Sequence, residues 1–156
     1  GQTLKIILLL VIALILSSCG FQLRGNMETS FKSIEINGGS SEIQKTLIKT
    51  YKQSGIEIKK SSAEKSIEII SDKLDKRILS LNASGKVSEY QLEYTLTYRI
   101  KNNIGEWGAP IIINASRSYT YDDDNRLAKE EEEKGLIKGM QDQIVRSMTS
   151  QISASK

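Results

Sequence analysis

Imidazole and thiol groups are nearly absent from this 156-residue chain. It contains no histidine and a single cysteine, Cys19. The missing imidazole excludes Ser–His and Cys–His nucleophilic pairs, histidine-based zinc sites and histidine acid–base catalysis. Carboxylates are plentiful, but no pair of them is placed by the sequence in a shared pocket. The side chains therefore predict no catalytic site and a protein that is not an enzyme.

Two acidic runs are the best candidates for cation binding. Asp122–Asp124 is followed by Asn125, but the segment lacks the spaced ligands, central glycine and terminal glutamate of an EF-hand loop. Helix capping explains it better. Glu130–Glu133, flanked by Lys129 and Lys134, is typical of a solvated helix start. We therefore expect neither a metal site nor a bound cofactor.

The one cysteine follows a segment that is typical of an export signal. Ile6–Leu16 is an uninterrupted run of eleven apolar residues, preceded by Lys5 and followed by two serines. A membrane-spanning helix needs about 20 apolar residues. The run therefore predicts a cleaved signal peptide over residues 1–18 rather than a permanent span.

The tetrapeptide Leu16-Ser17-Ser18-Cys19 resembles the lipobox of bacterial lipoproteins. The resemblance implies a diacylglycerol thioether on Cys19, cleavage just before it, and an acyl chain on the freed amino group. Several acyl chains hold a protein firmly on a bilayer. In the sorting rule that accompanies the lipobox, aspartate after the cysteine favours the inner membrane, so Gly20 implies the outer membrane. An ordinary signal peptide with a chance cysteine is the alternative.

Charge and length constrain the rest of the chain. It carries 22 basic and 19 acidic residues, a net charge of +3. Residues 1–18 contain one base and no acid, so their removal leaves 21 − 19 = +2. Nearly balanced, interspersed charges argue against a nucleic-acid partner. We expect residues 19–30 to form a lipidated tether and residues 31–156 to fold as a single domain.

Hydrophobic spacing predicts an α+β fold. Alternation predicts strands over 32–37, 77–83, 86–101 and 109–121, with room for a further short strand at Ile56–Ile58 and an apolar run over 67–70. A capping box and helical spacing predict a helix over 42–54. A second helix near the C-terminus is predicted by an apolar stripe, made of Leu136, Met140, Ile144, Met148 and Ile152. We expect a two-layer sandwich, with both helices packed on one face of a mostly antiparallel four-stranded sheet.

The strand over 86–101 has the clearest alternation. Tyr90, Tyr94 and Tyr98 share one side with two leucines and an isoleucine, while the alternate residues from Glu89 to Arg99 are polar. A row of tyrosines can stack bases or sugars, but these apolar neighbours favour a core. One face of the sheet should therefore pack on the helices, and the other should meet water or a polar partner.

Three segments, in the same order, resemble the lipopolysaccharide-assembly lipoprotein family LptE. They are Cys19–Gly25, Ser88–Leu92, and the stretch from Ser116–Tyr119 through Asp124 to Leu127–Lys129. Together they span most of the chain after the cysteine. The two-helix, sheet-based layout predicted above is similar to the fold of that family.

The resemblance implies a non-enzymatic role at the outer membrane: the lipoprotein sits within the lumen of the β-barrel LptD, helps it assemble, and contributes to lipopolysaccharide delivery. The polar strand face from Glu89 to Arg99 suits a wet barrel interior. Lys129, then Arg117 and Lys86, are the candidate contacts for lipid A phosphates, which basic side chains hold by charge-assisted hydrogen bonds. Structural alternatives are a bridge from Arg117 to Asp122–Asp124 and an ordinary hairpin-tip role for Lys86.

The sequence is also compatible with a second function. The chain could be a free-standing periplasmic lipoprotein that binds an amphipathic ligand. That reading predicts an apolar pocket and no stable barrel partner.

Overall fold

The computed structural model describes residues 1–16 and 29–156. Cys19, the predicted cleavage position and most of the predicted tether lie outside the described residues. Helices and strands follow one another in this order: α1 Gln2–Leu16, β1 Ser33–Gly38, α2 Ser41–Gln53, β2 Glu57–Ile58, β3 Lys65–Leu81, β4 Val87–Ile100, β5 Ile111–Thr120, the short 3₁₀-helix η1 Asp123–Asn125, and α3 Arg126–Ala154.

The predicted apolar run near the N-terminus lies within α1. This helix has 15 residues, and its large apolar side chains are exposed from Leu4 to Ile12. In the described part of the chain, no helix has both the length and the apolar character needed to cross a membrane.

The sheet has five strands in the order β2-β1-β3-β4-β5. β1 pairs in parallel with both β2 and β3, whereas β3, β4 and β5 are antiparallel neighbours. The predicted four-stranded, mostly antiparallel sheet is therefore wrong in detail: the sheet is mixed. The parallel pairing arises because α2 forms a crossover between β1 and β2, which returns the chain in its original direction.

β3 is one strand of 17 residues, which joins the apolar run at 67–70 to the strand predicted over 77–83. Its pairing with β4 shifts between Ile69 and Ser71 and again between Ile78 and Ser80. Each shift is a β-bulge, which adds one residue and reverses the phase of the side-chain alternation. The two phase changes made a continuous strand look interrupted.

The distal part of β3 has a free edge. β1 pairs only with Lys65–Ile69, so between Ile70 and Leu81 no described residue pairs with the side of β3 that faces away from β4. Leu74 and Ile78 on this stretch are 37% and 55% exposed. We call this stretch the open edge.

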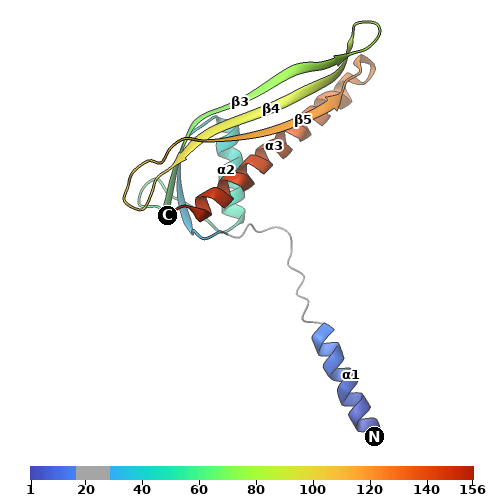
Figure 1. Ribbon diagram of the computed structural model, residues 1–156, viewed down its shortest axis with the longest axis vertical. Coiled ribbons are helices and arrows are strands. Elements are labelled where there is room, and N and C mark those ends of the chain that lie inside the picture. The colour runs from blue at the N-terminus through green and yellow to red at the C-terminus, as the bar shows by residue number, and fades with distance from the viewer. Residues whose placement is uncertain (17–28) are drawn as a thin grey trace.

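α2 and α3 lie on the same face of the sheet, as predicted (Figure 1). α2 begins after two glycines with positive φ, Gly38 and Gly39, which turn the chain out of β1. The side chain of Ser40 then caps the helix by accepting a hydrogen bond from the Ile43 backbone N–H.

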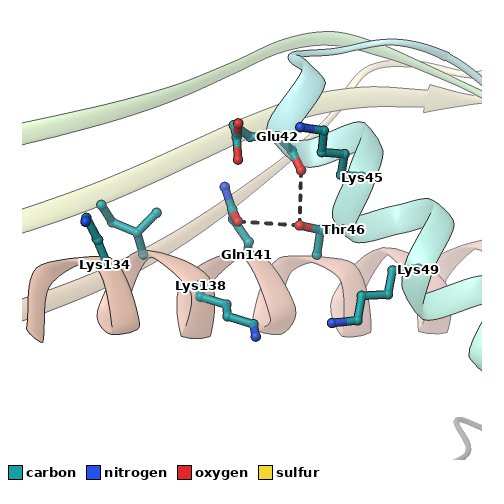
Figure 2. A pocket seen from close by; sticks show the side chains of 8 residues that line it. Glu42, Lys45, Thr46, Lys49, Lys134, Lys138 and Gln141 are labelled. Atoms are coloured by element: carbon teal, nitrogen blue, oxygen red, sulfur yellow. Dashed lines mark hydrogen bonds between the residues drawn. The ribbon is translucent and has the colours of Figure 1, made fainter. Parts of the chain in front are cut away.

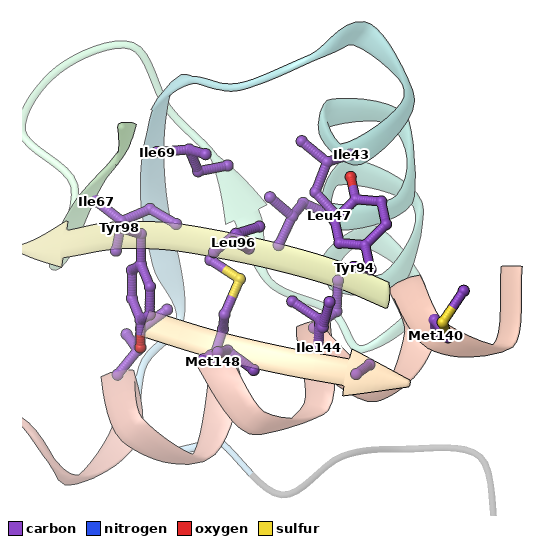
Figure 3. Close-up of a cluster of buried hydrophobic side chains, with 14 of the residues drawn as sticks. Ile43, Leu47, Ile67, Ile69, Tyr94, Leu96, Tyr98, Met140, Ile144 and Met148 are labelled. Carbon is purple, nitrogen blue, oxygen red and sulfur yellow. The ribbon is translucent and has the colours of Figure 1, made fainter. Parts of the chain in front are cut away.

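The hydrophobic core fills the space between the helices and the sheet. Figure 3 shows Leu47 of α2, Leu96 of β4 and Met148 of α3 pointing into the same interior, and all three are fully buried. Tyr94 and Tyr98 are buried there too, as predicted, whereas Tyr90 is partly buried at the edge of the core.

The core is concentrated in one half of the domain. We call residues 73–93 and 116–139 the distal half and the other residues from 29 onward the proximal half. Among the described residues, Leu92 and Tyr119 are the only buried apolar residues that the distal half contributes. In Figure 1 this half is the part of β3, β4, β5 and α3 that extends beyond α2.

Candidate functional site

The distal half is held together by a cluster of tyrosines around one ion pair, which we call the tyrosine–lysine cluster. The Nζ of Lys76 lies 2.9 Å from the Oε2 of Glu133, and the Tyr119 hydroxyl donates to the same oxygen at 2.9 Å. Lys76 Nζ also lies 4.3 Å from the centre of the Tyr90 ring, and the Tyr90 and Tyr121 rings meet edge to face at 5.1 Å. β3, β4, β5 and α3 are thus joined by polar and aromatic contacts.

The surroundings of Lys76 and Tyr119 shift the pKa of each group. Burial alone would lower the pKa of Lys76, but the neighbouring Glu133 and Tyr119 outweigh that effect and raise the pKa above its ordinary value. Burial is the main reason why the pKa of Tyr119 is raised, and the nearby ammonium opposes it. At neutral pH the lysine is therefore charged and the tyrosine keeps the proton that it donates to Glu133.

Lys76 was not among the site residues predicted from the sequence. It lies in the apparent gap between the apolar run at 67–70 and the strand predicted over 77–83, where the alternation is broken. The feature that could have revealed it is the alternate spacing of Asp72, Leu74, Lys76 and Ile78. These residues share the side of β3 that faces the helices, and Asp72 and Lys76 place charges on that side.

Lys129 and Lys86, two of the predicted binding residues, lie at the distal end. Lys129 Nζ donates to Thr120 Oγ1 and to Glu132 Oε2, each at 3.0 Å, and the lysine side chain is 20% exposed. Lys86 follows the turn between β3 and β4 and, with Tyr121 and the acids Asp122–Asp124, lines an open groove. A carboxylate-lined groove weakens the attraction of Lys86 for a phosphate.

Arg117 lies elsewhere. Its guanidinium donates to Gln143 Oε1 at 2.6 Å and to the Ser116 carbonyl at 2.8 Å. The alternative bridge to Asp122–Asp124 is wrong, because those acids act locally: Asp122 accepts from the Asp124 backbone N–H at 3.0 Å and caps η1. Arg117 is three positions before Thr120, about 10 Å along the strand, so the three predicted residues do not converge on one point.

The second notable surface is the face of the sheet turned away from the helices, here called the outer face. On β4 it carries the alternate residues from Glu89 to Arg99, which are all polar, and on β5 those from Ile112 to Thr120, of which only Ile112 is apolar. No element from the described chain covers it (Figure 1).

Side chains on the outer face are cross-linked between strands. Arg77 on β3 donates to Gln91 Oε1 on β4 at 2.8 Å, and Gln91 Nε2 donates to Ser116 Oγ on β5 at 3.0 Å. Near the other end, Arg99 pairs with Glu68 at 3.0 Å and lies 4.7 Å from the Trp107 ring. These contacts give a stiff and largely polar surface, on which Ile112 and Trp107 are isolated apolar groups.

Within residues 1–16 and 29–156 no group of three or more acidic, histidine or cysteine side chains could hold a metal ion. The groove beside Lys86 and the groove between α2 and α3 are lined largely by charged side chains. Both are open grooves with charged rims rather than enclosed apolar pockets.

Comparison with known proteins places this arrangement in context. Residues 31–152 match the family model described as LptE, lipopolysaccharide-assembly. The solution structure of an uncharacterized lipoprotein B from Nitrosomonas europaea is 31% identical, covering 86% of this chain and 91% of that chain with a TM-score of 0.70. Rare lipoprotein B from Shewanella oneidensis is 25% identical, with coverage of 76% and 95% and a TM-score of 0.64.

A minor lipoprotein from Acinetobacter baumannii shows the same fold at 22% identity, with coverage of 81% and 94% and a TM-score of 0.63. No curated protein sequence matches the chain.

Proposed function

Because the chain belongs to the LptE family of lipopolysaccharide-assembly proteins, we propose that it is a non-enzymatic plug and assembly factor for the outer-membrane β-barrel LptD. Family membership itself implies a role in lipopolysaccharide assembly and a location at the outer membrane. The contact with the barrel and the part played by each surface are the proposal.

The main structural support for this proposal is the outer face. The lumen of an outer-membrane barrel is polar and wet, so a domain seated in it needs a stiff surface of hydrogen-bonding groups. The outer face offers this: apart from Ile112 its side chains on β4 and β5 are polar, and the Arg77–Gln91–Ser116 contacts bind three strands together. A plug of this kind needs no catalytic residue.

A lipid anchor would hold the domain at the membrane. We propose that residues 1–18 are the signal peptide, that Cys19 receives the diacylglycerol and the N-acyl chain, and that residues 19–30 tether the folded domain 31–156. The apolar helix α1 supports an export signal.

The distal half is the proposed contact for lipopolysaccharide. Lys129 remains the first candidate and Lys86 the next, because both ammonium groups lie at this end of the molecule. Arg117 is the third; its guanidinium would have to leave Gln143 to reach a ligand. A phosphate would form charge-assisted hydrogen bonds with these groups.

The test is a pull-down of the membrane-anchored protein in mild detergent, with mass spectrometry of the proteins that stay bound. We expect an outer-membrane barrel at near-equal stoichiometry, and a Cys19→Ala control that loses its membrane anchor. Acylated Cys19 with no barrel recovered would reject the plug and leave a free-standing lipoprotein.

A matched pair of variants tests the outer face. Glu93→Lys reverses an exposed charge in its middle, whereas Glu106→Lys makes the same change in the exposed loop between β4 and β5. We expect Glu93→Lys to reduce barrel recovery and Glu106→Lys to leave it unchanged. Equal recovery with both variants would show that the outer face is not the contact.

A further inference from the structure

A second basic surface lies between α2 and α3, away from the three residues discussed above. The two helices form a groove of about 420 Å³ whose walls carry four lysines and one acid. Figure 2 shows this groove from close by, with lysines entering from both helices. Its lining residues are Glu42, Lys45, Thr46, Lys49, Lys134, Ile137, Lys138 and Gln141.

The lysines are arranged as two like-charged pairs. Lys45 and Lys49 are four residues apart on α2, and Lys134 and Lys138 are four residues apart on α3. Like charges at this spacing lie on one side of a helix and destabilise it. Figure 2 shows the ammonium groups of Lys49 and Lys138 pointing toward each other from opposite helices. The two helices thus bring four like charges to the same groove.

The described chain neutralises little of this charge. Among residues 29–156 the one ion pair that these lysines make is Lys134 with Glu131, at 3.2 Å, and both side chains are more than 70% exposed. An exposed pair of this kind is weak and opens easily. With Glu42 as the only acid in the lining, the groove carries a formal charge of 4 − 1 = +3.

The groove floor is suited to a compact ligand. Ile137 is half-buried and apolar, and Thr46 Oγ1 lies 3.1 Å from the Glu42 carbonyl and 3.5 Å from Gln141 Oε1. No aromatic side chain lines it, so it lacks the stacking platform of a nucleic-acid site. Lysine is a point-charge binder of phosphate, whereas planar recognition of carboxylates favours arginine.

We propose that the α2–α3 groove is a binding site for a phosphate-bearing saccharide headgroup, held by Lys45, Lys49, Lys134 and Lys138. The choice of ligand rests on the proposed function, which brings a phosphorylated glycolipid to this protein. The site differs from the one around Lys129: Lys134 and Lys138 lie five and nine residues after Lys129, about 7.5 and 14 Å along α3, and they share the groove with the lysines of α2.

Binding would relieve the repulsion between the four lysines. A phosphate placed between the helices supplies the counter-charge that the described residues lack, and it links α2 to α3. Occupancy should therefore stiffen the contact between these helices as well as capture the ligand.

The test uses the full-length protein in zwitterionic detergent micelles, with two probes. Pyrophosphate tests whether the groove binds a soluble phosphate, and diphosphoryl lipid A tests whether it binds a lipid headgroup. Amide chemical shifts of Thr46, Lys49 and Lys138 locate each probe, and titration at low salt gives its Kd. The groove variant is Lys49→Gln/Lys138→Gln. Its matched control is Lys59→Gln/Lys60→Gln, which removes the same two charges from the loop after β2.

We expect the groove variant to weaken both probes about fivefold, as losing two exposed charge contacts implies, and the control to change either Kd less than twofold. Equal weakening in both variants, or probes that leave the groove amides unmoved, would overturn the groove site. If both variants bound lipid A equally well, the groove site would be overturned but the proposed function would still stand. Pyrophosphate held in the groove without lipid A binding would keep the site but reject a lipopolysaccharide role.

Discussion

The proximal and distal halves of this domain share one sheet and one long helix, yet they are held together differently. Around α2, aliphatic side chains from both layers interlock in a buried core. Beyond α2, the same strands rest on half of α3 through tyrosines, Lys76 and Glu133, and the open edge exposes Leu74 and Ile78. The proximal half therefore supplies the stability, and the distal half supplies accessible charged and aromatic groups.

Asp72 connects three elements by hydrogen bonds at the boundary between the halves. Its carboxylate accepts from the Ser40 backbone N–H at 2.8 Å and from the Tyr94 hydroxyl at 2.7 Å, and it also accepts from the Ser40 hydroxyl. One side chain of β3 thus joins the start of α2 to β4.

A pair of alanine substitutions should give the largest contrast between the halves. Leu47→Ala removes a fully buried side chain from the proximal core and should cost about 2–5 kcal/mol of unfolding free energy. Ile78→Ala at the open edge should change it by about 0.5 kcal/mol or less. Urea denaturation followed by circular dichroism measures both. Similar losses would mean that the open edge is packed as tightly as the core.

Two glycines with nearly equal backbone angles sharpen the comparison. Gly38 has φ +76° and a Cβ there would lie 2.3 Å from the Ile69 carbonyl oxygen, while Gly85 has φ +78° and open space around it. Gly38→Ala should cost about 3 kcal/mol, because backbone strain and the clash add. Gly85→Ala should cost about 1 kcal/mol from strain alone. Thermal unfolding separates the two, and equal costs would argue against close packing of β1 on β3.

The tyrosine–lysine cluster should hold the distal half locally. Lys76→Met removes the partner of Glu133 and should cost about 1 kcal/mol, a modest value because the lysine side chain is 39% exposed. Lys73→Met, which breaks an ion pair whose partners are 74% and 62% exposed, serves as the control and should cost almost nothing. Hydrogen exchange should show faster opening near Tyr90 only in the first variant. Uniform exchange in both would deny the cluster a structural role.

The smallest expected effect is a pH dependence at the boundary. Burial opposes ionisation of Asp72, but the hydrogen bonds from Ser40 and Tyr94 outweigh it and hold the pKa below its ordinary value of 3.8. Because the folded-state pKa is the lower one, its stabilisation is complete above pH 3.8 and disappears as the pH falls through the folded-state value. Asp72→Asn should therefore flatten the decline of stability in acid. If the dependence of the unfolding free energy on pH in acid were unchanged in this variant, other carboxylates would be responsible for the decline.

The sequence predicted best where one periodicity runs unbroken. The strand predicted over 86–101 is β4, Val87–Ile100, and the helix predicted over 42–54 is α2, Ser41–Gln53. The short strand expected near 56–58 is β2, Glu57–Ile58. The sequence failed where tertiary pairing decides: β1 pairs in parallel with both β2 and β3, and the bulges in β3 reverse the alternation. Pairing partners and bulges leave no local signal that periodicity can read.

The type of side chain on the candidate surfaces could be predicted from the sequence better than the position of each residue. Alternation alone predicted a polar sheet face, because the period of a strand fixes which side chains share a side. It could not show that Arg117 reaches Gln143, since that contact depends on how α3 crosses β5. The lysine pairs of the α2–α3 groove were visible as repeats of four, but their facing arrangement required the packed helices.

The open edge of β3 has a consequence for solubility. Exposed strand edges are where copies of a protein add to one another and begin to aggregate. Here two bulges bend the strand, and Lys73, Asp75, Lys76 and Arg77 place charges along it. These are the features that prevent edge-to-edge polymerisation, so the longest unpaired backbone in the described sheet is protected without a covering strand.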